Sequence, residues 1–111
     1  MDNIHPLPRP PLQIAFDRLE LNRILDLYGR MVAAGHWRDY AIHLGREAAV
    51  FSAFRRAAER PEYRIEKRPE LRHRQGVWML VGENGTVLKR GHELAGVLAP
   101  VERRLLRLVE A

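Results

Sequence analysis

The chain has 111 residues, of which 46% are hydrophobic and 30% charged, the composition of one globular domain rather than of a disordered chain. It has no cysteine, which excludes disulfides, zinc–thiolate sites, iron–sulfur clusters and cysteine nucleophiles. No apolar run approaches the roughly 18 residues that cross a bilayer, and the N-terminus lacks the apolar core of a signal peptide. We therefore expect a cytoplasmic protein with no membrane partner.

Residues 1–12 hold four prolines and predict an extended, flexible tail, whereas residues 13–111 are expected to form a single domain. The first predicted element is a helix, because Asp17 and Glu20 form a capping-box pattern and apolar residues then recur at helical spacing until Gly35 ends the helix. This apolar stripe consists of Leu21, Ile24, Leu25, Tyr28, Met31 and Val32.

The middle of the chain changes to the two-residue period of β-strands. Strands are predicted at residues 37–44, 48–56, 63–67, 77–81 and 86–89. The pairs Gly45–Arg46 and Asn84–Gly85 are predicted turns, and short connections between consecutive strands favour an antiparallel meander of four or five strands. The second and fourth strands are apolar on both faces, so both sheet faces are expected to be covered, by helices on opposite sides or by a second subunit.

The C-terminal residues return to helical spacing, with an apolar stripe at Leu94, Leu98, Val101, Leu105 and Leu108. Pro100 lies inside the stripe, so we expect a helical segment that is kinked or broken there, or two short helices. The stripe predicts a helix that faces the core, and the alternative is a protein interface in a homodimer. The predicted fold class is α+β: an N-terminal helix, the meander and this C-terminal segment.

Catalytic patterns are scarce. The one serine, Ser52, lies on a predicted buried strand, and none of the five histidines forms an H-x-x-x-H pair. Asp39 and His43 would lie roughly 13 Å apart along a strand, too far for an acid–base pair. We therefore expect no catalytic site, no metal site and no cofactor.

The strongest charge signal lies in residues 55–74, which hold eight Lys or Arg against four Glu in a chain of net charge +5. The alternating charges of Glu62, Arg64, Glu66 and Arg68 predict a solvated face of paired charges that needs no ligand. The alternative is a surface for phosphates or an acidic protein, if the meander brings the clusters to one edge. Its candidate nucleic-acid contacts are Arg55, Arg56, Arg68, Arg72, Arg74, Lys89 and Arg90.

Four segments, WRDYAI, AVFSAFRR, PEYRIEKRPEL and VLKRGHEL, resemble a family of short bacterial proteins of unknown function over about residues 13–99. The resemblance implies a stand-alone cytoplasmic domain and carries no activity with it. Two hypotheses remain for the function. One is a small basic module that binds nucleic acid or an acidic protein. The other is a protein–protein adaptor or assembly factor that forms a homodimer through its C-terminal stripe or a sheet face.

Overall fold

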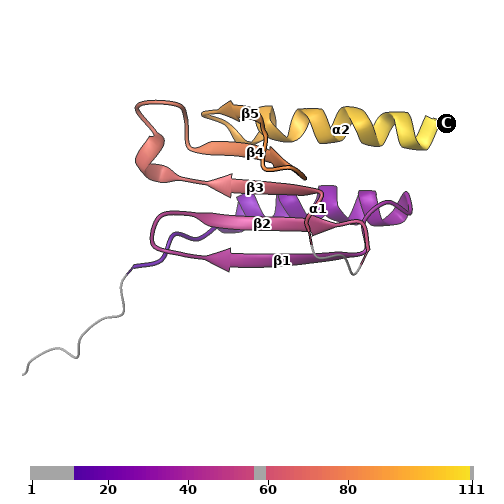
Figure 1. Ribbon diagram of the computed structural model, residues 1–111, viewed down its shortest axis with the longest axis horizontal. Helices are drawn as coiled ribbons and strands as arrows, with labels where there is room; N and C mark the ends of the chain where they lie inside the picture. Colours follow the sequence, from indigo (N-terminus) through magenta and orange to yellow (C-terminus); the bar gives the residue numbers. More distant parts are fainter. Residues whose placement is uncertain (1–11, 57–59, 111) are drawn as a thin grey trace, which may run out of the picture.

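The computed structural model describes residues 12–56 and 60–110, shown in Figure 1. The predicted tail, residues 1–12, therefore lies outside the described residues except for its last position. The elements are, in chain order, helix α1 (Arg18–Ala33), strands β1 (Asp39–Leu44), β2 (Ala49–Phe54) and β3 (Tyr63–Lys67), the 3-10 helix η1 (Pro69–Leu71), strands β4 (Trp78–Gly82) and β5 (Val87–Gly91), and helix α2 (Leu94–Glu110). The α+β architecture predicted from the sequence is confirmed.

The five strands form one antiparallel sheet in the order β1-β2-β3-β4-β5, which is the predicted meander. At the turn between β1 and β2 the Gly45 N–H donates to the Ala48 carbonyl at 2.9 Å, so Arg46 and Glu47 form the tip. The tip therefore lies one residue later than the predicted Gly45–Arg46 turn.

Helix α1 begins with the predicted capping box. The Asp17 carboxylate accepts from the Glu20 N–H at 2.8 Å, and the Glu20 carboxylate accepts from the Asp17 N–H at 2.8 Å. The buried side chains of the helix are those of Ile24, Leu27 and Met31. Val32, which the periodicity placed in the apolar stripe, is 40% exposed, so the buried face is rotated towards Leu27.

Both helices pack against the same face of the sheet. Phe51, Ile65 and Leu80 lie opposite one another on β2, β3 and β4, and all three belong to the core that α1 and α2 share. Figure 1 shows α1 behind the middle of the sheet and α2 alongside β4 and β5. The expectation that two helices cover opposite faces is therefore wrong. The physical reason is that each apolar stripe packs against the other helix as well as the sheet, which gives one core on one side.

Helix α2 continues through Pro100 as a single element. Pro100 lacks the N–H that would donate to the carbonyl four residues earlier. Val97, Leu98 and Val101 flank the proline and are fully buried, so their packing holds the helix together across the missing hydrogen bond. The alternative of two short helices is not what the structure contains.

Gly76 fixes the loop between η1 and β4 against the end of β5. Its φ is +96°, and a Cβ at this position would lie 2.3 Å from the carbonyl oxygen of Gly91. A backbone approach this close leaves no room for a side chain. The loop that carries Arg72 and Arg74 is thereby held beside the strand that carries Arg90.

Replacing Gly76 by alanine is expected to lower the free energy of unfolding more than the matched change Gly85→Ala. Both glycines have positive φ, +96° and +79°, but nothing lies within 4 Å of a Cβ built at Gly85. Gly85→Ala should therefore cost about 1–2 kcal/mol from backbone strain alone, and Gly76→Ala should cost clearly more. Urea denaturation followed by tryptophan fluorescence measures both. An equal decrease in the free energy of unfolding for both variants would show that the loop can move away from β5 to accommodate the alanine.

Candidate nucleic-acid interface

The direction of the strands divides the seven predicted cationic contacts between two ends of the sheet. Strands β3 and β5 run in the same direction, because each is antiparallel to β4. Arg68 follows β3, and the loop residues Arg72 and Arg74 come next in the chain. Lys89 and Arg90 lie towards the same end on β5. Five of the predicted contacts therefore lie towards one end.

Arg55 and Arg56 are at the opposite end, because they follow β2, which runs the other way. The length of β2 puts the two ends about 17 Å apart. Arg55 is moreover paired inside the chain: its Nε lies 3.1 Å from Glu62 Oε2 and its terminal nitrogen 2.9 Å from Glu83 Oε1. These two arginines therefore do not join the other five, contrary to the idea that all clusters converge on one edge.

The turn between β1 and β2 adds a cation that the sequence analysis did not single out. Strand β1 runs parallel in space to β3, so Arg46, at the tip of this turn, lies at the same end as Arg68. We call these residues, Arg46, Arg68, Arg72, Arg74 and Arg90, the basic end of the sheet. Lys89 is left out because its partner Leu80 faces the helices, which places Lys89 on the helix side of the sheet as well.

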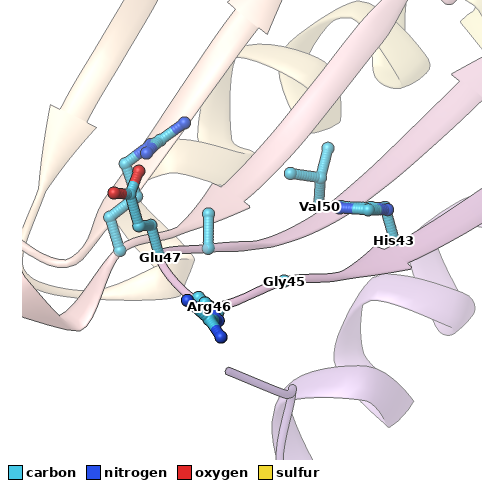
Figure 2. A pocket seen from close by; sticks show the side chains of 7 residues that line it. His43, Gly45, Arg46, Glu47 and Val50 are labelled. Atoms are coloured by element: carbon cyan, nitrogen blue, oxygen red, sulfur yellow. The ribbon is translucent and has the colours of Figure 1, made fainter. Parts of the chain in front are cut away.

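A hollow of about 440 Å³ lies at the basic end, between the β1–β2 turn and Arg68. Figure 2 shows Arg46 and Glu47 at the turn and His43 and Val50 along the two strands. The hollow is lined by His43, Gly45, Arg46, Glu47, Ala48, Val50 and Arg68. Two arginines and a histidine thus surround it, against one carboxylate.

Glu66 holds Arg68 in place beside this hollow. Its carboxylate is buried and accepts from Arg64 Nε at 3.1 Å and from Arg68 Nε at 3.0 Å, one arginine on each oxygen. The bond to Arg68 uses Nε and leaves the two terminal nitrogens of the guanidinium for another acceptor. Glu66 is 4% exposed, so the prediction of a solvated face is wrong at this position, although the predicted pairing of charges is confirmed.

Glu62 is the second charged residue whose burial the sequence did not predict. It is 7% exposed at the end away from the hollow. It accepts from Trp37 Nε1 at 2.9 Å, and its carboxylate lies 2.9 Å from an Arg104 terminal nitrogen and 3.1 Å from His36 Nε2. A buried tryptophan needs an acceptor for its N–H, which is the only signal in the sequence for such a carboxylate. Nothing local indicates that Glu62 is the one that supplies it.

The pKa of the Glu62 carboxyl is lowered, because the effect of its hydrogen bonds and neighbouring charges is larger than the effect of its burial. Burial alone would raise the pKa of the Glu62 carboxyl, but the hydrogen bonds from Trp37 and Arg104 and the positive charges of Arg104 and His36 lower the pKa below its ordinary value. The ionised carboxylate therefore ties the segment before β1 and the start of β3 to helix α2.

The aromatic side chains that could stack on bases and the predicted interface residues of the C-terminal stripe are mostly inside the molecule. Trp37 and Trp78 are 1% and 5% exposed, and Tyr63 is half-buried beside Trp37. None of these rings is a free platform for a base. Of the C-terminal stripe, Leu94, Leu98, Val101 and Leu105 are buried in the core and only Leu108, at 36%, reaches the surface.

The family model described as Protein of unknown function (DUF2794) matches residues 14–98 of the chain. The chain belongs to this family. The match runs from the segment before α1 into the first part of α2, and it confirms the resemblance seen in the sequence. Neither the curated proteins nor the solved structures contain a detectable relative of the chain.

Two further properties concern only the described residues. No helix among them is both long and apolar enough to span a bilayer. Within the same ranges, no three His, Asp or Glu side chains come together as metal ligands do.

The stability of the protein should decrease when Glu62 is protonated. Because the pKa of Glu62 is lowered in the folded state, the stabilisation is present above about pH 4.5 and is lost as the pH falls through the folded-state pKa. Glu62→Gln removes this dependence and should cost about 2 kcal/mol at pH 7. Urea denaturation between pH 7 and pH 3 should show a steeper fall for the wild type than for the variant. Parallel curves would show that other carboxyls dominate the acid sensitivity.

Proposed function

We propose that this protein is a small basic module that binds nucleic acid through the phosphates of its backbone at the basic end of the sheet. The observation that supports this most is that four separate segments, the β1–β2 turn, the end of β3, the following loop and β5, place Arg46, Arg68, Arg72, Arg74 and Arg90 at the same end of the sheet. Within the described residues, Arg46, Arg72 and Arg74 have no ion-pair partner.

The chemistry of the basic end suits phosphate better than base recognition. Arginine binds phosphate oxygens through two parallel N–H donors, and Arg68 is already held by Glu66 with its terminal nitrogens available. The buried tryptophans remove the aromatic platforms that stack bases. Binding should therefore depend on phosphate neutralisation and counterion release, with little sequence preference.

The alternative function, an adaptor or assembly factor that forms a homodimer through the C-terminal stripe, has less support. Four of the five stripe residues pack in the core, so a partner could reach them only by opening the fold. The sheet face that carries Arg64, Glu66 and Arg68 is not covered by either helix, and it combines these charged side chains with the partly buried apolar side chains of Val50 and Met79.

The double change Arg72→Ala and Arg74→Ala should weaken binding and flatten its dependence on salt. Removing two phosphate contacts lowers the slope of log K against log salt by about 1.8 on duplex DNA. Fluorescence anisotropy with random-sequence duplexes and single strands, on nuclease-treated protein at several salt concentrations, measures this.

Arg38→Ala with Arg56→Ala is the matched control, because it removes the same charge from the opposite end, where both residues are exposed. This control variant should have the same slope of log K against log salt as the wild type, within experimental error. If both double variants lose the same amount, net charge and not the basic end governs binding. If the wild type fails to bind at low salt, the proposed function is wrong.

A further inference from the structure

Strand β1 is an unprotected edge of the sheet. It pairs with β2 on one side, and no described strand lies on the other side (Figure 1). All six of its residues are exposed, including three large apolar or aromatic ones: Tyr40 is 42% exposed, Ile42 39% and Leu44 36%. An edge that presents free backbone groups and apolar side chains is a template for another strand.

The other edge strand, β5, carries the features that prevent such pairing. Lys89 and Arg90 lie on it, and its pairing with β4 is interrupted by an irregularity at Leu80 and Val81. Charged side chains and bulges are the usual protection of an edge. Strand β1 has no lysine, arginine or proline, its one carboxylate is Asp39 at the first position, and its register with β2 is regular throughout. The contrast singles out β1 as the edge left open for a partner.

The backbone groups of β1 that point away from β2 can be assigned. Gly45 donates to Ala48, and hydrogen-bonded positions alternate along an antiparallel strand, so His43, Ala41 and Asp39 are the residues hydrogen-bonded to β2. The N–H and carbonyl groups of Tyr40, Ile42 and Leu44 therefore face outward. The outward N–H of Tyr40 is satisfied by the carboxylate of Asp39 at 2.8 Å.

We propose that β1 pairs with β1 of a second copy of this chain, antiparallel about a two-fold axis at Ala41. In this register Tyr40 lies opposite the partner's Ile42, and Ile42 opposite the partner's Tyr40, so the outward backbone groups of these residues bond reciprocally. On the opposite face of the strand, Asp39 lies opposite the partner's His43, and the two-fold axis repeats this pair. The strand is thus complementary to itself in both hydrogen-bonding groups and apolar surface, as a two-fold interface requires.

The contact between Asp39 and Tyr40 supports this arrangement. In the single chain the Asp39 carboxylate bonds the outward N–H of Tyr40. In the pair, this N–H donates instead to the carbonyl of the partner's Ile42, which releases the carboxylate towards the partner's His43. The bond to Asp39 is therefore replaced and not lost.

A neighbouring register with the same backbone pattern, centred at Ile42, is less favourable. It places Arg38 opposite the partner's Arg46, and like charges directly opposite each other destabilise a strand pair. It also moves Asp39 away from the partner's His43. Of these two registers, charge favours the one centred at Ala41.

The pair would form one continuous sheet of two copies. A two-fold axis perpendicular to the sheet keeps the helices of both copies on the same side. The basic ends lie beyond Leu44 of each strand, pointing away from each other, so the pairing leaves them accessible. The proposal does not depend on nucleic-acid binding, and each can fail without the other.

Sedimentation equilibrium of the wild type should give the mass of two chains at high concentration and of one chain on dilution. Ile42→Lys puts a charge on the open edge and should raise the dissociation constant at least tenfold. Val87→Lys is the matched control, because Val87 is 37% exposed, close to Ile42 in exposure, and lies on the other edge strand. It should leave the constant unchanged, and circular dichroism confirms that both variants are folded.

Ile42→Pro tests the backbone pairing itself. The N–H of Ile42 faces outward, so proline removes no hydrogen bond to β2 and is tolerated on an edge strand. The variant should stay folded and be a single chain at every concentration.

A charge exchange tests the register. Asp39→Lys and His43→Asp should each weaken association. The double variant should regain most of it, because the ammonium introduced at position 39 would then face the carboxylate introduced at position 43 of the partner. Failure of the double variant to recover would overturn the register centred at Ala41. A wild type that remains a single chain up to about 1 mM, or an association unaffected by Ile42→Lys and Ile42→Pro, would overturn the proposal as a whole.

Discussion

The packing of α1 and α2 against one face of the sheet is the constraint on which the rest of the structure depends. Phe51, Ile65 and Leu80 form the row that both helices cover, and the helices also contact each other, so a single core is closed on one side. The opposite face and the edge at β1 consequently receive no helix among the described residues. The surfaces that we propose for binding are those that this packing leaves uncovered.

Two buried carboxylates decide which arginines are available to a partner. Glu66 orients Arg64 and Arg68 on the open face, and Glu62 engages Arg55 and Arg104 at the far end. Burying a carboxylate is unfavourable unless several donors surround it, and here each has at least two. The number of arginines in the sequence therefore overstates the number that are available to a partner. Arg55, Arg64, Arg68 and Arg104 pair with these carboxylates, whereas Arg46, Arg72 and Arg74 of the basic end have no such ion pair among the described residues.

The two edge strands of the meander, β1 and β5, differ in the side chains that they expose. β5 carries Lys89 and Arg90, whereas β1 presents the exposed side chains of Tyr40 and Ile42. An open β1 and a basic end are compatible, because one lies along the side of the sheet and the other at the end of its strands. A molecule of this kind can associate through its edge and bind a polyanion at the two distant ends of the resulting sheet, which is the arrangement that our two proposals together describe.

The sequence by itself determined the elements, their order and the antiparallel meander, because hydrophobic period, the Asp17–Glu20 capping box and the turns are local properties. It also favoured a core-facing surface for the apolar stripe of α2, including Leu98, but left a homodimer interface as the alternative. Only the tertiary structure decided on which face both helices pack, that Glu66 is buried, and that Arg55 lies at the opposite end from Arg68. These features depend on strand direction and on contacts between residues far apart in the chain. No local pattern encodes them, since the same alternation of charges in β3 is compatible with a solvated face and with a buried carboxylate between two arginines.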